Sequence, residues 1–206
     1  MTNYQKELDI LIEGLDRRPR LLLHSCCGPC SSYVLEYLAK HFDITLYYYN
    51  PCIFPQEEYF RRLEAQKQLL EITAQAELLE SEYDHKSFLS LVKGLEKEKE
   101  GGERCTVCFE QRLFATAKAA KEGGFDYFAT TLTVSPHKNA PLLNEIAKKA
   151  EEIYGIPHLP SDFKKKNGYK RSVELSREYG LYRQGYCGCE FSKAEAENYL
   201  KEKEKQ

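Results

Sequence analysis

The feature that most constrains the fold is an alternation of short apolar runs with longer stretches of helical period. The predicted strands are Arg20 to Ser25, Ile44 to Tyr49, Glu77 to Leu79, Tyr127 to Leu132 and a short one near His158. The predicted helices are 4–16, 31–40, 56–73, 86–97, 108–122, 142–154, 168–179 and a last one from Lys193. Strands alternating with helices of this length predict a mainly parallel sheet with helices on both faces. The expected fold class is α/β and Rossmann-like.

We expect a single domain over residues 1–206, with a Rossmann-like core at 18–160 and a helical segment at 161–206 that carries a C-G-C motif. A chain with 42% apolar and 30% charged residues is not mainly disordered. Its apolar runs are far shorter than the roughly 18 residues of a membrane span, and its first twenty residues resemble no signal peptide. A cytoplasmic location is expected. The net charge of -2 supplies no protein-wide attraction for RNA, so any RNA contact needs a local patch.

Clustered cysteines are the strongest chemical feature. The chain has 8 cysteines among 206 residues, well below the roughly 8 to 10% typical of a disulfide scaffold. In a reducing compartment, clustered thiols indicate metal or redox chemistry. Cys52 stands alone beside Ile53 and Phe54 and is interpreted as a small buried hydrophobe. The other seven form three groups: Cys26/Cys27/Cys30, Cys105/Cys108 and Cys187/Cys189.

Two of these groups predict a four-thiolate site. Cys105 and Cys108 lie at the expected start of a helix, where the helix N-terminus favours the thiolate that a metal needs. Cys26 and Cys27 follow the first strand, where an α/β fold places its ligands. Four thiolates suit zinc as well as an iron–sulfur cluster, and the position of the adjacent pair favours the cluster.

Other functions remain open at this stage. Cys27-Gly28-Pro29-Cys30 opens a helix after a strand, which is also the dithiol arrangement of thioredoxins. The alternatives are therefore a thiol–disulfide oxidoreductase and a zinc-stabilised binding module. Cys187 and Cys189 are separated by a single glycine, a spacing that suits an easily reduced disulfide or the binding of a second metal.

Polar residues after the strands are candidates for substrate contact. His137 and Lys138 follow the strand at 127–132, where they are placed to donate hydrogen bonds or a proton. His24 lies inside an apolar run and is interpreted as a core or supporting group. Basic and aromatic residues interleave before the last cysteine pair, a pattern that suits nucleotide binding as well as an ordinary helix surface. The substrate or tRNA candidates are Asn50, Ser135, Asn139, Lys170, Arg171 and Arg183.

The motifs together closely resemble those of the epoxyqueuosine reductases of the QueH family, from about Arg20 to Ser192 and in family order. They are Cys26-Cys27-Gly28-Pro29-Cys30, Tyr49-Asn50-Pro51, Arg104-Cys105-x-x-Cys108, Thr130-Thr131-Leu132 with Ser135-Pro136-x-Lys138-Asn139, and Tyr182-Arg183-Gln184-x-Tyr186-Cys187-Gly188-Cys189. The resemblance implies an oxidoreductase that reduces epoxyqueuosine in tRNA to queuosine, the last step of that modification, with a [4Fe-4S] cluster. It further implies Cys26, Cys27, Cys105 and Cys108 as cluster ligands and Cys187 with Cys189 as a redox-active pair.

The resemblance also implies a further iron next to the cluster, for which Cys30 is the expected ligand. Deoxygenating an epoxide to an alkene takes two electrons and two protons and releases water. A [4Fe-4S] cluster passes one electron at a time, so a second centre is expected, supplied by the Cys187/Cys189 pair or the additional iron. Lys138 or His137 is expected to deliver protons. The expected partners are tRNA carrying epoxyqueuosine and an electron donor of unknown identity.

Overall fold

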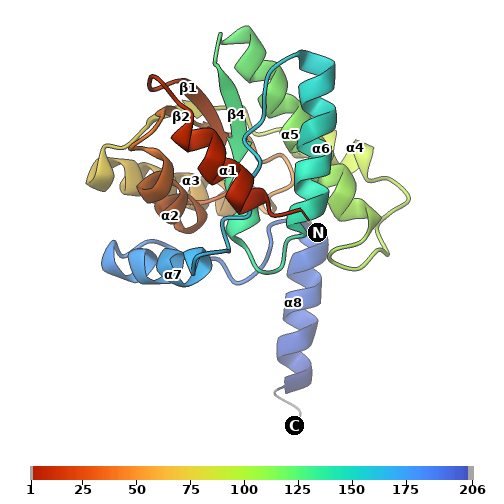
Figure 1. The fold of residues 1–206 in the computed structure, drawn as a ribbon. Helices are drawn as coiled ribbons and strands as arrows, with labels where there is room; N and C mark the ends of the chain where they lie inside the picture. Colours follow the sequence, from red (N-terminus) through yellow and green to blue (C-terminus); the bar gives the residue numbers. More distant parts are fainter. Residues whose placement is uncertain (1, 204–206) are drawn as a thin grey trace.

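The computed structural model describes residues 2–203, so Met1 and residues 204–206 of the predicted domain lie outside the described residues. Its centre is a four-stranded sheet in the order β3-β2-β1-β4, in which every pairing is parallel (Figure 1). The strands are β1 (Arg20–His24), β2 (Asp43–Tyr48), β3 (Glu77–Glu80) and β4 (Tyr127–Thr130). The predicted α/β fold with a parallel sheet is therefore confirmed.

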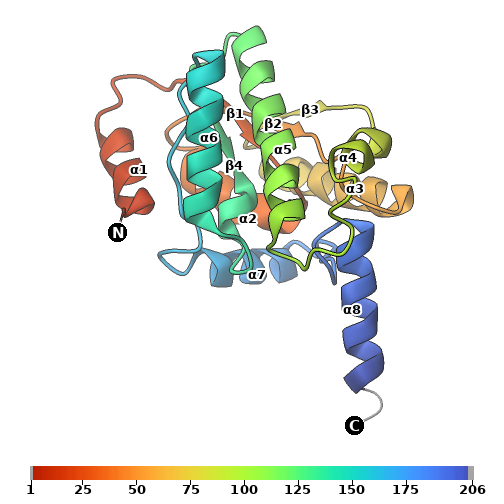
Figure 2. The ribbon, with the colours of Figure 1, turned by 90° about the vertical axis from the view of Figure 1, so that its right-hand side faces the viewer.

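Eight α-helices and one short 3-10 helix are formed by the described residues. They are α1 (Tyr4–Glu13), α2 (Gly28–Leu38), α3 (Gln56–Thr73), α4 (His85–Leu91), α5 (Glu103–Glu122), η1 (Thr131–Val134), α6 (Ala140–Tyr154), α7 (Gly168–Glu178) and α8 (Glu190–Lys203). Helix α8 projects away from the body of the molecule (Figures 1 and 2). No helix within residues 2–203 is both long and apolar enough to cross a membrane.

The alternation of side chains along β1 divides the core into two layers. Leu21 and Leu23 pack with residues of α1, α2, α3 and α7, whereas Leu22 packs with α5 and α6 on the opposite face. All three leucines are fully buried, because a central strand with helices on both faces exposes neither side to water. Figure 2 shows α5 and α6 side by side on one face of the sheet. A third apolar cluster lies at the carboxyl end of β2, between α3 and α4.

Several predicted boundaries were wrong. The helix expected at 86–97 ends at Leu91, and the helix expected from Cys108 begins at Glu103. The segment between them contains Gly94 at a φ of 90°, a conformation that favours glycine and interrupts the helix. The Arg104 side chain points back into this segment and donates to the carbonyls of Leu95, Glu96 and Glu98. Arg104 therefore fixes the loop between α4 and α5 through contacts of its own buried side chain.

Two strand predictions also need correction. The strand expected at Tyr127 to Leu132 ends at Thr130, because the Thr130 hydroxyl accepts from the Leu132 N–H and turns the chain into η1. The strand expected near His158 is a single bridge to Phe128. The remaining strands, including β1 and β2, agree with prediction to within one or two residues.

Candidate active site

A cavity of about 640 Å³ lies at the carboxyl edge of the sheet. Parallel strands end at the same edge, so the turns after β1 and β4 meet there, and the segment between α7 and α8 closes the cavity from the other side. Its lining residues are Cys26, Pro29, Cys30, Glu100, Arg112, Leu132, Ser135, His137, Lys138, Tyr169, Ser172, Arg183, Gln184, Gly185, Tyr186, Cys187, Ser192, Glu195, Ala196 and Tyr199. The cavity thus combines thiols with basic and aromatic side chains.

The first cysteine group forms a compact cluster at the start of α2. The Sγ atoms of Cys26, Cys27 and Cys30 all lie within 4.8 Å of one another, a spacing that suits a shared metal. Gly28 lets this turn approach α3, because a Cβ atom there would lie 2.6 Å from the carbonyl oxygen of Ala65. The backbone packing of α2 on α3 therefore places the cluster.

The thiols of this cluster differ in pKa. Hydrogen bonds with Cys26 and Cys30, helped by the positive charge of Arg62, hold the pKa of Cys27 well below its ordinary value. Hydrogen bonds with Cys26 and Cys27 have the opposite effect on Cys30 and raise its pKa well above the ordinary value. The amide of Gln184 also donates to Cys27 Sγ at 3.2 Å. Of the three thiols, Cys27 therefore loses its proton most readily, and the thiolate is the form that binds a metal.

Cys105 and Cys108 lie on the first two turns of α5. The Gly101 N–H donates to Cys105 Sγ at 3.2 Å, and the Arg112 guanidinium donates to Cys108 Sγ at 3.2 Å. Within the described chain, neither sulfur belongs to the compact group formed by the first three cysteines. Cys26 and Cys105, however, both pack against the apolar cluster that side chains of α5, α6 and β4 form. The two groups therefore face the same region of the molecule.

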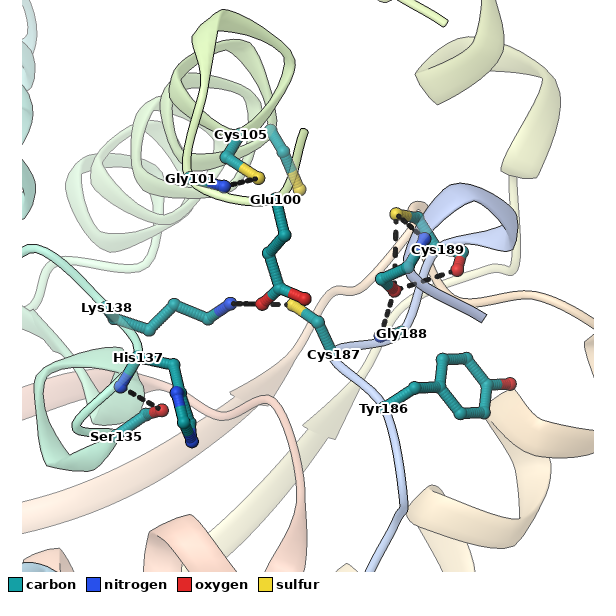
Figure 3. A network of polar contacts seen from close by, with 12 residues as sticks. Glu100, Gly101, Cys105, Ser135, His137, Lys138, Tyr186, Cys187, Gly188 and Cys189 are labelled. Carbon is teal, nitrogen blue, oxygen red and sulfur yellow. Dashed lines mark hydrogen bonds and ion pairs between the residues drawn. The ribbon is translucent and has the colours of Figure 1, made fainter. Parts of the chain in front are cut away.

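Lys138 is positioned between two partners that come from distant segments (Figure 3). Its Nζ lies 2.7 Å from Cys187 Sγ and 3.0 Å from Glu100 Oε1, with only 8% of its side chain exposed. Burial lowers the pKa of Lys138, but Cys187 and Glu100 outweigh burial and raise it. Burial raises the pKa of Cys187 to about 11, although Lys138 opposes this effect. The site therefore holds an ammonium beside a protonated thiol at neutral pH.

The two thiols of the C-G-C motif are both free and have different partners. Cys187 faces the cavity and Lys138, whereas the buried Cys189 contacts Ser192 in the first turn of α8, with 3.4 Å from the Ser192 N–H to Sγ (Figure 3). Gly188 between them has a φ of 154°, which side chains rarely adopt. This glycine permits the turn that separates the thiols.

Some predicted substrate residues reach the cavity and others do not. His137, Ser135 and Arg183 line it. Asn50 is buried and donates to the carbonyl of Ser25, so it ties two post-strand turns together. Asn139 accepts from the Leu142 N–H and caps α6.

The two basic candidates on α7, Lys170 and Arg171, also differ in their surroundings. Arg171 makes two hydrogen bonds to the Glu36 carboxylate, at 3.0 and 2.7 Å, and ties α7 to α2. Lys170 is exposed and lies outside the cavity lining. His24 is fully buried between the Thr130 hydroxyl and the Tyr49 carbonyl, which agrees with its interpretation as a core group.

Sequence reasoning missed Glu100, Gln184 and Arg112, and it assigned no role to Cys52. Glu100 lies in a run of alternating charges that reads as solvated surface. Arg112 follows Cys108 by one helical turn, a spacing that could have indicated contact between the two side chains. Cys52 is buried, as predicted, and lies next to Cys108, which lowers the pKa of Cys52 to about 6.

The fold and the cavity define an α/β protein with a thiol-rich, metal-competent site at the carboxyl edge of a parallel sheet. The profile of the family described as "Epoxyqueuosine reductase QueH" matches residues 21–195. The chain belongs to this family of oxidoreductases, and the resemblance of the motifs is confirmed. Family membership does not favour the thioredoxin-like and zinc-module alternatives.

Curated relatives and a solved structure agree with this assignment. Proteins named epoxyqueuosine reductase QueH from Staphylococcus epidermidis and Staphylococcus aureus are 47% and 48% identical over 92% of this chain and 84% and 83% of their own lengths. The Streptococcus pyogenes protein of that name is 49% identical over 85% of this chain and 71% of its own. A crystal structure from Methanocaldococcus jannaschii, titled as a predicted subunit of tRNA methyltransferase, superposes with a TM-score of 0.51. It covers 89% of this chain and 88% of its own, and at 16% identity it supports the fold alone.

Proposed function

We propose that this chain reduces epoxyqueuosine to queuosine in tRNA. The observation that carries the proposal is the lining of one cavity by thiols from two cysteine groups together with a buried ammonium, in a chain of the QueH family. The reaction consumes two electrons and two protons and releases the epoxide oxygen as water. Thiols can supply the electrons of this reaction when they are oxidised, and an ammonium can supply a proton.

We further propose that Cys26, Cys27, Cys105 and Cys108 hold a [4Fe-4S] cluster and that Cys30 binds an additional iron. The donor chemistry fits, because these are thiols, three of which lie within 4.8 Å of one another. The buried, positively charged Arg112 beside Cys108 also fits an anionic centre. When bound, these groups supply single electrons and a Lewis acid for the epoxide oxygen.

The residues around the cavity have separate tasks in this proposal. Cys187 and Cys189 are a dithiol whose oxidation to a disulfide releases two electrons and two protons, which balances the reduction of one epoxide to an alkene and water. Lys138 holds a proton at Nζ beside Cys187 and is the proton donor to the leaving oxygen. His137, exposed at the rim, is a second candidate donor. An electron donor must then reduce the disulfide.

The described residues also support a proposal for tRNA contact. Arg183 at the cavity and Lys170 on the exposed face of α7 are placed to meet phosphates, and Tyr169 offers an aromatic face beside them. Arg171 is not part of this proposal, because its guanidinium is paired with the Glu36 carboxylate. In this arrangement the described part of the C-terminal segment, residues 161–203, belongs to one domain with the core at 18–160 and completes its cavity.

Replacing Arg183 by Gln is expected to weaken tRNA binding at low salt. The slope of log K against log salt concentration should decrease by about 0.7 to 0.9, because one fewer phosphate is neutralised. Fluorescence anisotropy of labelled tRNA over a salt titration measures this slope. Lys148→Gln also removes one positive charge, from an exposed position on α6. It is the control and should leave the slope unchanged. An unchanged slope for Arg183→Gln would remove Arg183 from the tRNA surface.

The function itself is tested on anaerobically purified protein. It should be brown, contain about four or more irons per chain, and convert epoxyqueuosine to queuosine in tRNA when a chemical reductant is supplied. Iron and sulfide analysis, absorption spectra and mass spectrometry of digested tRNA measure these properties. Colourless protein that binds only zinc, with tRNA left unchanged, would contradict the proposed function.

A further inference from the structure

Arg112 on α5 places a guanidinium among sulfur atoms. Only 3% of the residue is exposed, and it lines the same cavity as Cys26 and Cys187. Its Nε donates to the carbonyl oxygen of Cys108 at 3.1 Å and its Nη2 donates to Cys108 Sγ at 3.2 Å. The side chain thus folds back by one helical turn and is fixed by two bonds to a single cysteine.

This buried cation differs from the two other buried guanidiniums of the described chain. Arg62 pairs with the Glu58 carboxylate at 2.7 Å, and Arg104 lies 3.6 Å from Glu195. Arg112 forms no ion pair with any carboxylate in residues 2–203. An unpaired buried charge is strongly unfavourable, so the fold must provide a negative partner by other means.

Sulfur atoms, and no carboxylate of residues 2–203 within ion-pair distance, surround the Arg112 guanidinium. The guanidinium contacts Cys108 Sγ, and Cys26 and Cys187 line the same cavity as Arg112. These three thiols come from three separate segments of the chain. The surroundings of this side chain therefore suit a centre whose negative charge is distributed over sulfur.

We propose that Arg112 is a positioning residue that orients Cys108 as a metal ligand and raises the reduction potential of the iron–sulfur centre. This role rests on the proposed function, because it requires a cluster at Cys108. A fixed positive charge and an N–H···S hydrogen bond both stabilise the added electron of a reduced cluster more than the oxidised state. Arg112 thereby makes the centre easier to reduce.

The test compares full-length Arg112→Gln and Arg112→Lys with the wild type, all loaded anaerobically with iron and sulfide. At a fixed applied potential, the ratio of reduced to oxidised cluster should fall at least tenfold in Arg112→Gln, which corresponds to about 59 mV for one electron. Arg112→Lys keeps the charge but loses the two-pronged contact, so a smaller fall of about threefold is expected. Lys118→Gln, an exposed change on the same helix, should match the wild type. Spectroscopic redox titration measures the ratio without any tRNA turnover.

The outcomes separate this role from the proposed function. Wild-type protein that takes up no [4Fe-4S] cluster overturns the proposed cofactor, and with it the role of Arg112. If the wild type takes up the cluster but both Arg112→Gln and Arg112→Lys have the same reduction potential as the wild type, the role of Arg112 is overturned and the proposed cofactor is not. If Arg112→Gln fails to fold or to hold iron, Arg112→Lys decides by itself. A ratio within measurement error of the wild type then overturns the role.

Discussion

Replacing Cys26 by Ser will remove most of the bound iron and lower epoxyqueuosine turnover by more than about a hundredfold. Even partners that only support a metal ligand typically cost 10- to 100-fold when lost, so a missing ligand costs more. Cys26 lies within 4.8 Å of two further thiols and lines the cavity, so a hydroxyl there breaks the site at its centre. Iron per chain, cluster absorption and turnover of modified tRNA measure the effect.

Matched cysteine variants identify which sulfurs are ligands. Cys105→Ser and Cys108→Ser should lose iron as Cys26→Ser does, whereas Cys30→Ser should keep about four irons and lose only the additional one. Cys52→Ala should keep all of its iron, although Cys52 lies next to Cys108. If Cys52→Ala loses iron while Cys105→Ser retains it, the proposed ligand set is wrong and Cys52 belongs to it. Circular dichroism shows whether each variant folds.

Replacing Lys138 by Met is expected to lower turnover by about 10² to 10⁴-fold, the usual contribution of a positioned proton donor. The ammonium lies 2.7 Å from Cys187 Sγ and is buried, so bulk water cannot substitute for it efficiently. Lys138→Arg retains the charge but releases a proton far less readily, and it should also be slow. Lys148→Met on the exposed face of α6 is the control and should have wild-type turnover. Wild-type turnover of Lys138→Met would remove Lys138 from catalysis.

The same site predicts the pH dependence of Cys187 alkylation. The pKa of Cys187 is raised to about 11, so alkylation should be slow at neutral pH and rise about tenfold per pH unit towards that value. Lys138 lowers this pKa and Glu100 raises it, so Lys138→Met should slow alkylation while Glu100→Gln should accelerate it. Mass spectrometry of the iodoacetamide-labelled Cys187 peptide gives the rates. If both variants are alkylated at the wild-type rate, neither Lys138 nor Glu100 affects the pKa of Cys187.

Local patterns were sufficient to predict most of the fold. The apolar runs of β1 and β2, and the helical period of α3 and α6, depend on neighbours within a few residues, and the structure has them nearly as predicted. The start of α5 was missed by five residues because Arg104 and the loop before it are held by tertiary contacts. The positions of cysteines after strands were likewise visible in the sequence, since parallel strands bring their carboxyl ends to one edge.

The sequence by itself determined an α/β sheet, the carboxyl-edge location of the first cysteine group and the motifs of the QueH family. Only the tertiary structure decided that Glu100 and Lys138 meet Cys187, that Arg171 is neutralised by Glu36, and that Arg112 lies among sulfurs. These contacts join segments separated by up to 135 residues. They depend on how each helix is rotated against the sheet. Such rotations follow from the packing of the whole core, so no local pattern encodes them.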